Sequence, residues 1–313
     1  PRPGAPPRRA ARGPAPPPGP PADPPMHDDR PLVDAAWLRA RLHEPSLRVV
    51  DCTILMTPRP VGPSRIDSGR PRYEAAHVPG AVFIDPVASL AAPGAPTPYS
   101  LGDPERVGAA LRGAGVDDDT TIVLYTTSHP MVATRTWWML RASGARDVRV
   151  LDGGLAGWQA AGGPVTDRLP EVVPGRFVAR RVPALRASLD DVRAALGDPS
   201  VRLLNALSAQ QFAGTGGAHY GRPGRIPGSV GLPFASLLDP RTGCFLDAPT
   251  LRRAFDEAGV SPSTPAIHYC GGGVAASGTL FAAALVGRRH DRLYDHSLLE
   301  WSADPALPMV ADG

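Results

Sequence analysis

Short apolar runs alternate with longer amphipathic segments along most of the chain. The runs Leu47–Asp51, Thr121–Tyr125 and Val148–Leu151 have the length and the β-branched content of buried strands. The longer segments Pro104–Ala114 and Met131–Ala142 have the hydrophobic spacing of helices. This alternation predicts an α/β fold in which each parallel sheet is covered by helices on both faces.

The same order of elements occurs twice along the chain. Val201–Asn205 matches the strand that ends at Asp51, and Ala266–Cys270 matches Ile122–Thr126. In both halves a turn ending in Pro-Gly precedes a short apolar segment. Because the repeat is far longer than one unit of a solenoid, it indicates a duplicated domain.

The composition divides the chain into four parts. The first 25 residues hold twelve prolines and almost no large apolar side chain, which is typical of a disordered segment. Prolines recur between the two halves, at Pro170, Pro174 and Pro183. In the first half we expect the first helix at Val33–Leu42. The predicted parts are a Pro/Arg-rich tail at 1–30, a first domain at 31–163, a linker at 164–186 and a second domain at 187–313.

Composition and charge exclude several classes of function. The chain is 42% hydrophobic and 20% charged, as in soluble globular proteins, and no apolar run is long enough to span a membrane. The formal charge of +3 is carried by the tail, which has four arginines and one aspartate, so the rest is neutral. Without a basic surface we expect no nucleic-acid binding. Three cysteines without close spacing favour a reducing compartment, which we predict to be the cytoplasm, and they argue against a structural zinc site.

The segment with the clearest chemistry surrounds Cys270. An apolar strand ends there, three consecutive glycines follow, and the Ala-rich segment beyond them is predicted to be helical. A thiol at a helix N-terminus, facing backbone N–H groups that glycine leaves accessible, is expected to have a lowered pKa. A buried structural cysteine followed by a tight turn is the simpler interpretation.

Two other kinds of site share parts of this pattern. Gly271 to Ala276 fits G-x-G-x-x-A, and Asp295 follows at a suitable distance for a dinucleotide site. Such a turn should lie early in its domain, whereas only one strand-like run, Arg292–Tyr294, remains after it. A cysteine phosphatase needs an arginine soon after the cysteine, and none occurs up to Leu285. We therefore set both interpretations aside.

Several motifs together resemble the tandem rhodanese family, the thiosulfate and mercaptopyruvate sulfurtransferases. They are the paired Pro-Gly turns, the Leu151-Asp152-Gly153-Gly154-Leu155 segment with Trp158, the second-half Tyr294-Asp295 with Trp301, and the Cys270 loop. The loop is similar to the mercaptopyruvate type. The resemblance implies two rhodanese-like domains, with the catalytic cysteine in the second. In the first half Thr126 stands at that position and cannot carry a persulfide.

The resemblance also implies a set of site residues. Cys270 would be the nucleophile, and backbone amides would hold the transferred sulfur. A substrate-binding arginine is expected where this chain has Gln211, and Leu207 replaces a second arginine. Arg222 and Arg225 are the nearest cations that could compensate. The predicted substrate-binding residues are Gly271, Gly272, Gly273, Val274, Ala275, Gln211, Arg222 and Arg225.

These observations predict a cytoplasmic sulfurtransferase. It would move sulfane sulfur from a small-molecule donor such as thiosulfate or 3-mercaptopyruvate to cyanide or a thiol through a Cys270 persulfide. No metal or organic cofactor is expected. Neither nucleic acid nor membrane is expected as a partner. A non-catalytic or redox-sensing rhodanese-like module is the alternative, since the two lost arginines would suit a domain that only binds.

Overall fold

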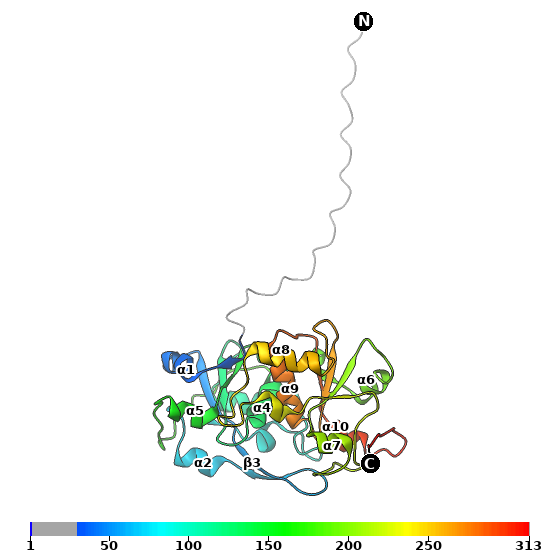
Figure 1. Cartoon of the computed structure of the whole chain (residues 1–313). Coiled ribbons are helices and arrows are strands. Elements are labelled where there is room, and N and C mark those ends of the chain that lie inside the picture. The colour runs from blue at the N-terminus through cyan, green and yellow to red at the C-terminus, as the bar shows by residue number, and fades with distance from the viewer. Residues whose placement is uncertain (2–29, 313) are drawn as a thin grey trace.

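The computed structural model describes residue 1 and residues 30–312. Two parallel sheets lie side by side, with helices packed between and around them (Figure 1). The predicted tail at 1–30 falls almost entirely outside the described residues.

The first half contains a five-stranded sheet in the order β1-β7-β6-β2-β5, and every pair in it is parallel. Alternate residues of its strands face two separate hydrophobic clusters: Val49 and Val123 one, Val50 and Leu124 the other. Both faces are therefore buried, as the sequence predicted for a parallel sheet. The strands are β1 (Leu32–Val33), β2 (Leu47–Asp51), β5 (Val82–Phe83), β6 (Thr121–Tyr125) and β7 (Val148–Leu151).

The second half repeats this sheet in the equivalent order β10-β9-β11-β12-β8, also with parallel pairs throughout. The central strands β6 and β11 occupy the same position in their sheets, and Cys270 follows β11 as Thr126 follows β6. The match confirms the duplicated α/β architecture. The strands are β8 (Arg186–Ala187), β9 (Arg202–Asn205), β10 (Val230–Gly231), β11 (Ala266–Tyr269) and β12 (Arg292–Tyr294).

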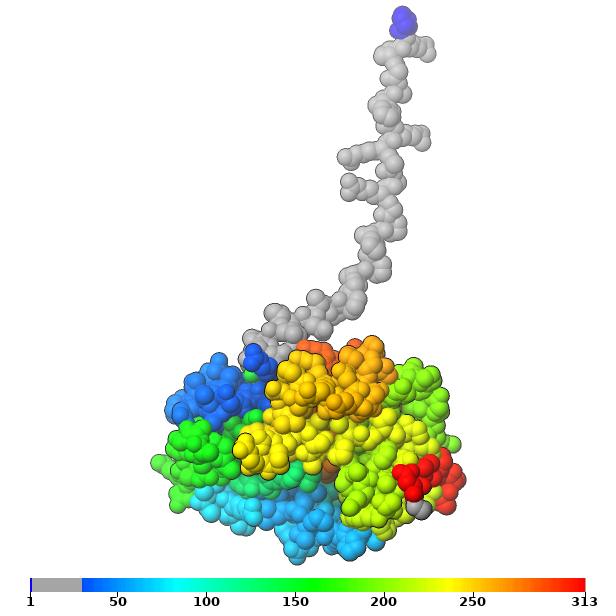
Figure 2. All heavy atoms as spheres, in the orientation of Figure 1, coloured from blue at the N-terminus to red at the C-terminus, as the bar shows by residue number. Residues whose placement is uncertain are grey.

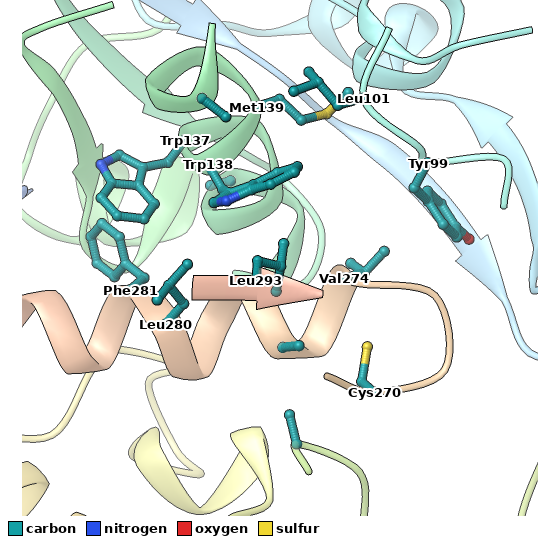
Figure 3. Packing of buried hydrophobic residues seen from close by; sticks show 14 of the residues in the cluster. Tyr99, Leu101, Trp137, Trp138, Met139, Cys270, Val274, Leu280, Phe281 and Leu293 are labelled. Atoms are coloured by element: carbon teal, nitrogen blue, oxygen red, sulfur yellow. The ribbon is translucent and has the colours of Figure 1, made fainter. Parts of the chain in front are cut away.

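Two equivalent helices meet at the centre of the molecule. In each half the longest helix follows the central strand, and α4 packs against α9 (Figure 1). Trp137 of α4 meets Phe281 of α9 edge to face, with ring centroids 5.0 Å apart (Figure 3). One continuous hydrophobic cluster thus includes residues of both halves. In the space-filling view of Figure 2 the two halves are in contact along most of their boundary.

The α-helices are α1 (Ala35–Arg41), α2 (Arg70–Ala75), α3 (Pro104–Gly113), α4 (Met131–Ala142), α5 (Gly154–Ala160), α6 (Leu189–Ala194), α7 (Ala209–Ala213), α8 (Ala248–Glu257), α9 (Val274–Leu285) and α10 (Ser297–Trp301). Short helical turns occur at Pro86–Leu90, Pro183–Leu185 and Phe234–Leu237. None of the helices within residues 30–312 combines the length and the apolar character that a membrane crossing requires.

The first helix starts two residues later than predicted. Leu32 and Val33 pair with β7 as an edge strand, and Asp34 then caps the helix by accepting a hydrogen bond from the Trp37 amide at 2.7 Å. An aspartate at this position satisfies a free amide of the first turn. The apolar pair before it is strand, although it continues the helical spacing.

The proline-rich segment between the halves is ordered along the first half. Phe177 is buried, and its amide donates to the Val116 carbonyl at 3.1 Å. The Arg180 and Val182 amides donate to the carbonyls of Ser143 and Ala142, both at 2.9 Å. The segment therefore acts as a strap, and its last residues lead into β8. The predicted boundaries at 163 and 186 stay our proposal for dividing the chain into domains.

A hairpin that the sequence did not predict extends from the first half to the second. Its strands, β3 (Ile54–Thr57) and β4 (Arg65–Ser68), pair antiparallel. At its tip the Gly62 amide donates to the His219 carbonyl at 2.8 Å, and the His219 amide donates to the Pro60 carbonyl at 3.1 Å. The hairpin therefore fixes the segment that contains Tyr220.

Candidate active site

Cys270 lies at the junction of β11 and the N-terminus of α9 (Figure 3). Gly273 caps the helix with a left-handed backbone, at a φ of 81°, so the three-glycine turn can close tightly. The Gly273 amide donates a hydrogen bond to the Cys270 sulfur at 3.1 Å. Only 2% of Cys270 is exposed. The loop thus presents an N–H donor and the positive end of a helix to a buried sulfur.

Helix α10 orients the peptide groups of the turn. The Leu298 amide donates to the Cys270 carbonyl at 3.1 Å, and the Leu299 amide donates to the Gly271 carbonyl at 2.9 Å. In a planar trans peptide the N–H points opposite to the carbonyl. The amides of Gly271 and Gly272 therefore point away from α10. Val274 and Ala275 lie in the first turn of α9, whose amides have no acceptor within the helix.

Ser297 holds the backbone of Cys270 itself. Its hydroxyl accepts from the Cys270 amide at 3.1 Å and donates to the Tyr294 carbonyl at 2.8 Å. Ser297 has a φ of 52°, and among the described residues it is the one non-glycine with a positive φ. Its counterpart in the first half is Gly154, with a φ of 57°. A serine in a conformation that favours glycine indicates that the hydroxyl is needed here.

Each glycine of the turn faces a different neighbour. A Cβ on Gly271 would lie 2.2 Å from the Tyr220 ring, and one on Gly273 would lie 2.4 Å from the Asp295 carbonyl oxygen. At Gly272 the nearest atom would be a methyl of Leu299, at 3.1 Å. The room that the sequence predicted around the sulfur is therefore taken up at Gly271 and Gly273 by protein atoms.

Arg135 of α4 joins the first half to this loop. Its guanidinium is 2% exposed and donates to the Gly273 carbonyl at 3.3 Å, to the Tyr99 carbonyl and to the Asp295 carboxylate. Asp295 also accepts from the Leu101 amide at 3.0 Å. A buried ion pair with this many hydrogen bonds fixes Tyr99, the Cys270 turn and the end of β12 relative to one another.

The chain is similar to known proteins over most of its length. Residues 34–161 match the Rhodanese-like domain family. The chain is 35% identical over 284 residues to the probable 3-mercaptopyruvate sulfurtransferase of Pseudomonas aeruginosa, with 89% of this chain and 97% of that protein covered. The chain belongs to the tandem-domain rhodanese family of sulfurtransferases.

Three further comparisons also cover most of the chain. The 3-mercaptopyruvate sulfurtransferase of Escherichia coli K12 is 32% identical, with 88% of this chain and 96% of that protein covered. The crystal structure of SseA from Escherichia coli, a 3-mercaptopyruvate sulfotransferase, superposes with a TM-score of 0.75 at 31% identity, covering 85% of this chain and 98% of that one. The wild-type structure of EanB, at 23% identity and a TM-score of 0.75, covers 91% and 70% of the two chains and shares the fold.

A pocket of about 290 Å³ is lined in part by Tyr220 and Leu298, both of which contact the Cys270 turn. Gln211, Tyr220 and Arg222 line it together with the glycine-rich segment 214–224. The Gln211 side chain donates to the Ala218 carbonyl at 2.7 Å. Arg222 donates to the carbonyls of Ser302 and Asp304, at 3.1 and 2.8 Å. The predicted Gln211 and Arg222 therefore lie at one pocket, with the Arg222 guanidinium partly engaged by the protein.

The structure gives Arg225 other partners. Its guanidinium lies over the Phe212 ring, donates to the Phe212 carbonyl at 3.3 Å and pairs with Asp312 at 2.7 Å. It does not line the pocket. The sequence predicts Arg225 as a substrate-binding cation, whereas these contacts indicate that it holds the C-terminal segment in place.

The histidines beside the loop are engaged elsewhere. His268 is fully buried, 2.8 Å from the Thr279 hydroxyl and 3.1 Å from the Asp291 carboxylate. Burial alone would raise the pKa of Asp291, but bonds and charges from His268 and Arg288 lower it to about 2. His296 pairs with Glu300 at 2.9 Å. In the described part of the chain no three His, Cys, Asp or Glu side chains are grouped to hold a metal ion.

Sequence reasoning missed four residues of this site: Tyr99, Arg135, Tyr220 and Ser297. Only Ser297 left a signal, because it stands where the first half has Gly154 in an otherwise matching segment. The other three come from segments far from Cys270 in the sequence. Tyr99 and Arg135 belong to the first half, so their position also depends on how the halves pack.

Proposed function

We propose that this sulfurtransferase moves sulfane sulfur from thiosulfate or 3-mercaptopyruvate to cyanide or a thiol through a persulfide on Cys270. The observation that carries the proposal is the Gly273 N–H at 3.1 Å from the sulfur, at the start of α9. The relatives in Pseudomonas and Escherichia, described as 3-mercaptopyruvate sulfurtransferases, support the donor class and disfavour a module that only binds.

In the first half-reaction the Cys270 thiolate attacks the outer sulfur of the donor. A sulfur–sulfur bond forms, and the bond from that sulfur to the rest of the donor breaks with its electron pair on the leaving group. The terminal sulfur of the persulfide is then anionic. The amides of Gly271, Gly272, Gly273, Val274 and Ala275 are the donors that we assign to it. Fixed dipoles of this kind need no reorganisation during the reaction.

In the second half-reaction the acceptor attacks the terminal sulfur, and the Cys270 thiolate leaves. The two half-reactions share one site, which requires ping-pong kinetics. No step needs a metal or an organic cofactor.

We assign the anionic end of the donor to the pocket lined by Gln211 and Arg222, and its sulfur to the space beside Cys270. With the Arg222 guanidinium partly engaged and Arg225 paired to Asp312, anion binding there relies mainly on N–H dipoles. A high KM for anionic donors is the consequence. The three cysteines are free thiols, which suits the reducing compartment that we propose, the cytoplasm.

The test is the mass of the protein after incubation with a donor and removal of excess reagent. We expect the wild type to gain the mass of one sulfur atom on the peptide that contains Cys270, and to lose it on addition of cyanide. Cys270→Ser should fold, gain no sulfur and transfer none. Cys244→Ala is the matched control, because burial raises the pKa of that half-buried thiol and it lies outside the loop. Sulfur carried by the Cys270→Ser protein would overturn the proposal.

A further inference from the structure

The geometry around Tyr99 assigns it a catalytic role that depends on the proposed function. We propose that its phenol carries a proton from the thiol of the donor to the carbon that leaves. The site is then matched to donors whose sulfur is a thiol on a carbon next to a carbonyl group, of which 3-mercaptopyruvate is one.

The Tyr99 hydroxyl is buried without a partner. The residue is 4% exposed, and its oxygen makes no hydrogen bond in the described part of the chain, although the Ser64 hydroxyl lies near it. An unpaired buried hydroxyl costs roughly 1–3 kcal/mol. Such a group is rare in folded proteins and calls for an explanation beyond packing. A ligand that enters the site would supply the missing partner.

The backbone of Tyr99 is fixed against the Cys270 loop from both sides. The Tyr99 carbonyl accepts from Arg135, which also bonds the Gly273 carbonyl. Two residues later the Leu101 amide donates to Asp295. The Tyr99 ring would lie 3.7 Å from a Cβ on Gly272. Figure 3 shows the ring reaching from the first half toward the loop that follows Cys270.

Tyr99 and Tyr220 are the two phenols close to Cys270. Burial, then the neighbouring Tyr220 and Cys270, raise the pKa of Tyr99, and burial and Cys270 raise that of Tyr220 to about 12. Both therefore hold their protons at neutral pH. The Gln211 side chain lies beside the Tyr220 hydroxyl and the Ser64 side chain beside that of Tyr99, but of the two hydroxyls it is the Tyr99 one that is buried without a hydrogen-bond partner. His268 and His296 are bonded to Asp291 and Glu300.

The proposed step balances without another reagent. The Cys270 thiolate attacks the thiol sulfur of the donor, a sulfur–sulfur bond forms, and the carbon–sulfur bond breaks with its electrons passing into the ketone as an enolate. Tyr99 gives its proton to the enolate carbon, which becomes a methyl group. The phenolate then takes the proton of the new persulfide S–H. Thiolate and mercaptopyruvate become persulfide anion and pyruvate, and Tyr99 is unchanged.

Thiosulfate provides the contrast, because sulfite leaves as an anion and its transfer involves no proton. Loss of the Tyr99 hydroxyl should therefore affect the two donors differently. General acid catalysis typically contributes about 10²–10⁴-fold to a rate.

The experiment measures single-turnover release of pyruvate from 3-mercaptopyruvate and of sulfite from thiosulfate, with enzyme in excess and no acceptor. For Tyr99→Phe we expect pyruvate release to fall by about 100-fold or more, with sulfite release within about threefold of wild type. Tyr220→Phe should show no such selectivity. The matched control is Tyr73→Phe, a buried tyrosine of the first half whose hydroxyl is already bonded to the Ala81 carbonyl at 2.8 Å. It should match wild type with both donors, and thermal unfolding checks each variant.

Equal losses with both donors, or no loss with either, would overturn the role of Tyr99 and leave the proposed function intact. So would a wild type that accepts thiosulfate alone, or selectivity that appears in Tyr220→Phe. A wild type that forms no persulfide from either donor would overturn the proposed function, and the role of Tyr99 with it.

Discussion

Ser297 and Gly154 occupy equivalent positions in the two halves, yet only one of them carries a side chain. Both adopt a left-handed backbone at the start of an equivalent helix, α10 or α5. The first half has Thr126 at the position of the proposed nucleophile Cys270. There Gly154 provides the left-handed backbone without a side chain. In the second half the Ser297 hydroxyl satisfies the Cys270 amide. The serine therefore combines backbone strain with a hydrogen bond at the reacting residue.

Two substitutions at Ser297 separate strain from hydrogen bonding. Ser297→Gly and Ser297→Ala both leave the Cys270 amide unpaired, so both should transfer sulfur more slowly. Because only glycine reaches this φ without strain, Ser297→Gly should have a free energy of unfolding about 1–2 kcal/mol above that of Ser297→Ala. Urea denaturation and donor turnover measure the two effects. Full activity in Ser297→Gly would show that the hydroxyl is dispensable.

At the scale of the element, the glycines of the turn between β11 and α9 differ in backbone conformation and in the space around them. Gly273 requires a left-handed backbone and lies against the Asp295 carbonyl. A Cβ on Gly272 would come closest to a methyl of Leu299 and would lie at ordinary contact distance from Thr97 and Tyr99. A uniform run of three glycines in the sequence conceals this difference.

Alanine substitutions at Gly272 and Gly273 test this difference. Gly273→Ala should lower the free energy of unfolding by about 2–4 kcal/mol, since strain at φ and overlap with fixed backbone add together. Gly272→Ala should stay within about 1 kcal/mol of wild type, because the Leu299 methyl can move aside. Chemical denaturation of both proteins gives the comparison. Equal stabilities would contradict the geometry described for Gly273.

The elements themselves could largely be predicted from the sequence. The spacing of apolar residues predicted the central strands and the helices after them, because burial on both faces makes such runs distinctive. Leu32–Val33 was missed because a two-residue edge strand is too short to show a period of its own. The sequence predicted the segment 164–186 as a linker but not its order along the first half, because that order comes from bonds to Ala142, Ser143 and Val116, which lie elsewhere in the chain.

At the scale of the whole molecule, the proposed active site is formed by both halves. The second half supplies Cys270 and its turn, and the first half supplies Arg135 and Tyr99. The sequence predicted the first half as a rhodanese-like domain without the catalytic cysteine, with Thr126 at that position. It could not predict Arg135, because nothing in the helical spacing of α4 distinguishes an arginine that crosses to the other half from one in solvent.

Arg135 should therefore matter for both stability and activity. Removing one partner of a buried ion pair leaves the other uncompensated, so Arg135→Ala should lower the free energy of unfolding by about 3–5 kcal/mol and reduce sulfur transfer. The matched control is Arg65→Ala, whose partner Asp67 lies 2.9 Å away at the surface, and which should cost less than about 1 kcal/mol. Urea denaturation compares them. Similar losses in both variants would show that Arg135 does not join the halves.

The burial of Cys270 has a consequence for the lifetime of the persulfide that we propose on it. With 2% of the residue exposed and the Tyr220 ring against Gly271, bulky oxidants and alkylating reagents have no direct approach to the sulfur. The same enclosure would shield the sulfur atom that we propose Cys270 to carry from water and from unrelated thiols. We therefore expect a small acceptor, or a thiol on a narrow projecting segment, to discharge the proposed persulfide faster than a thiol on a broad protein surface.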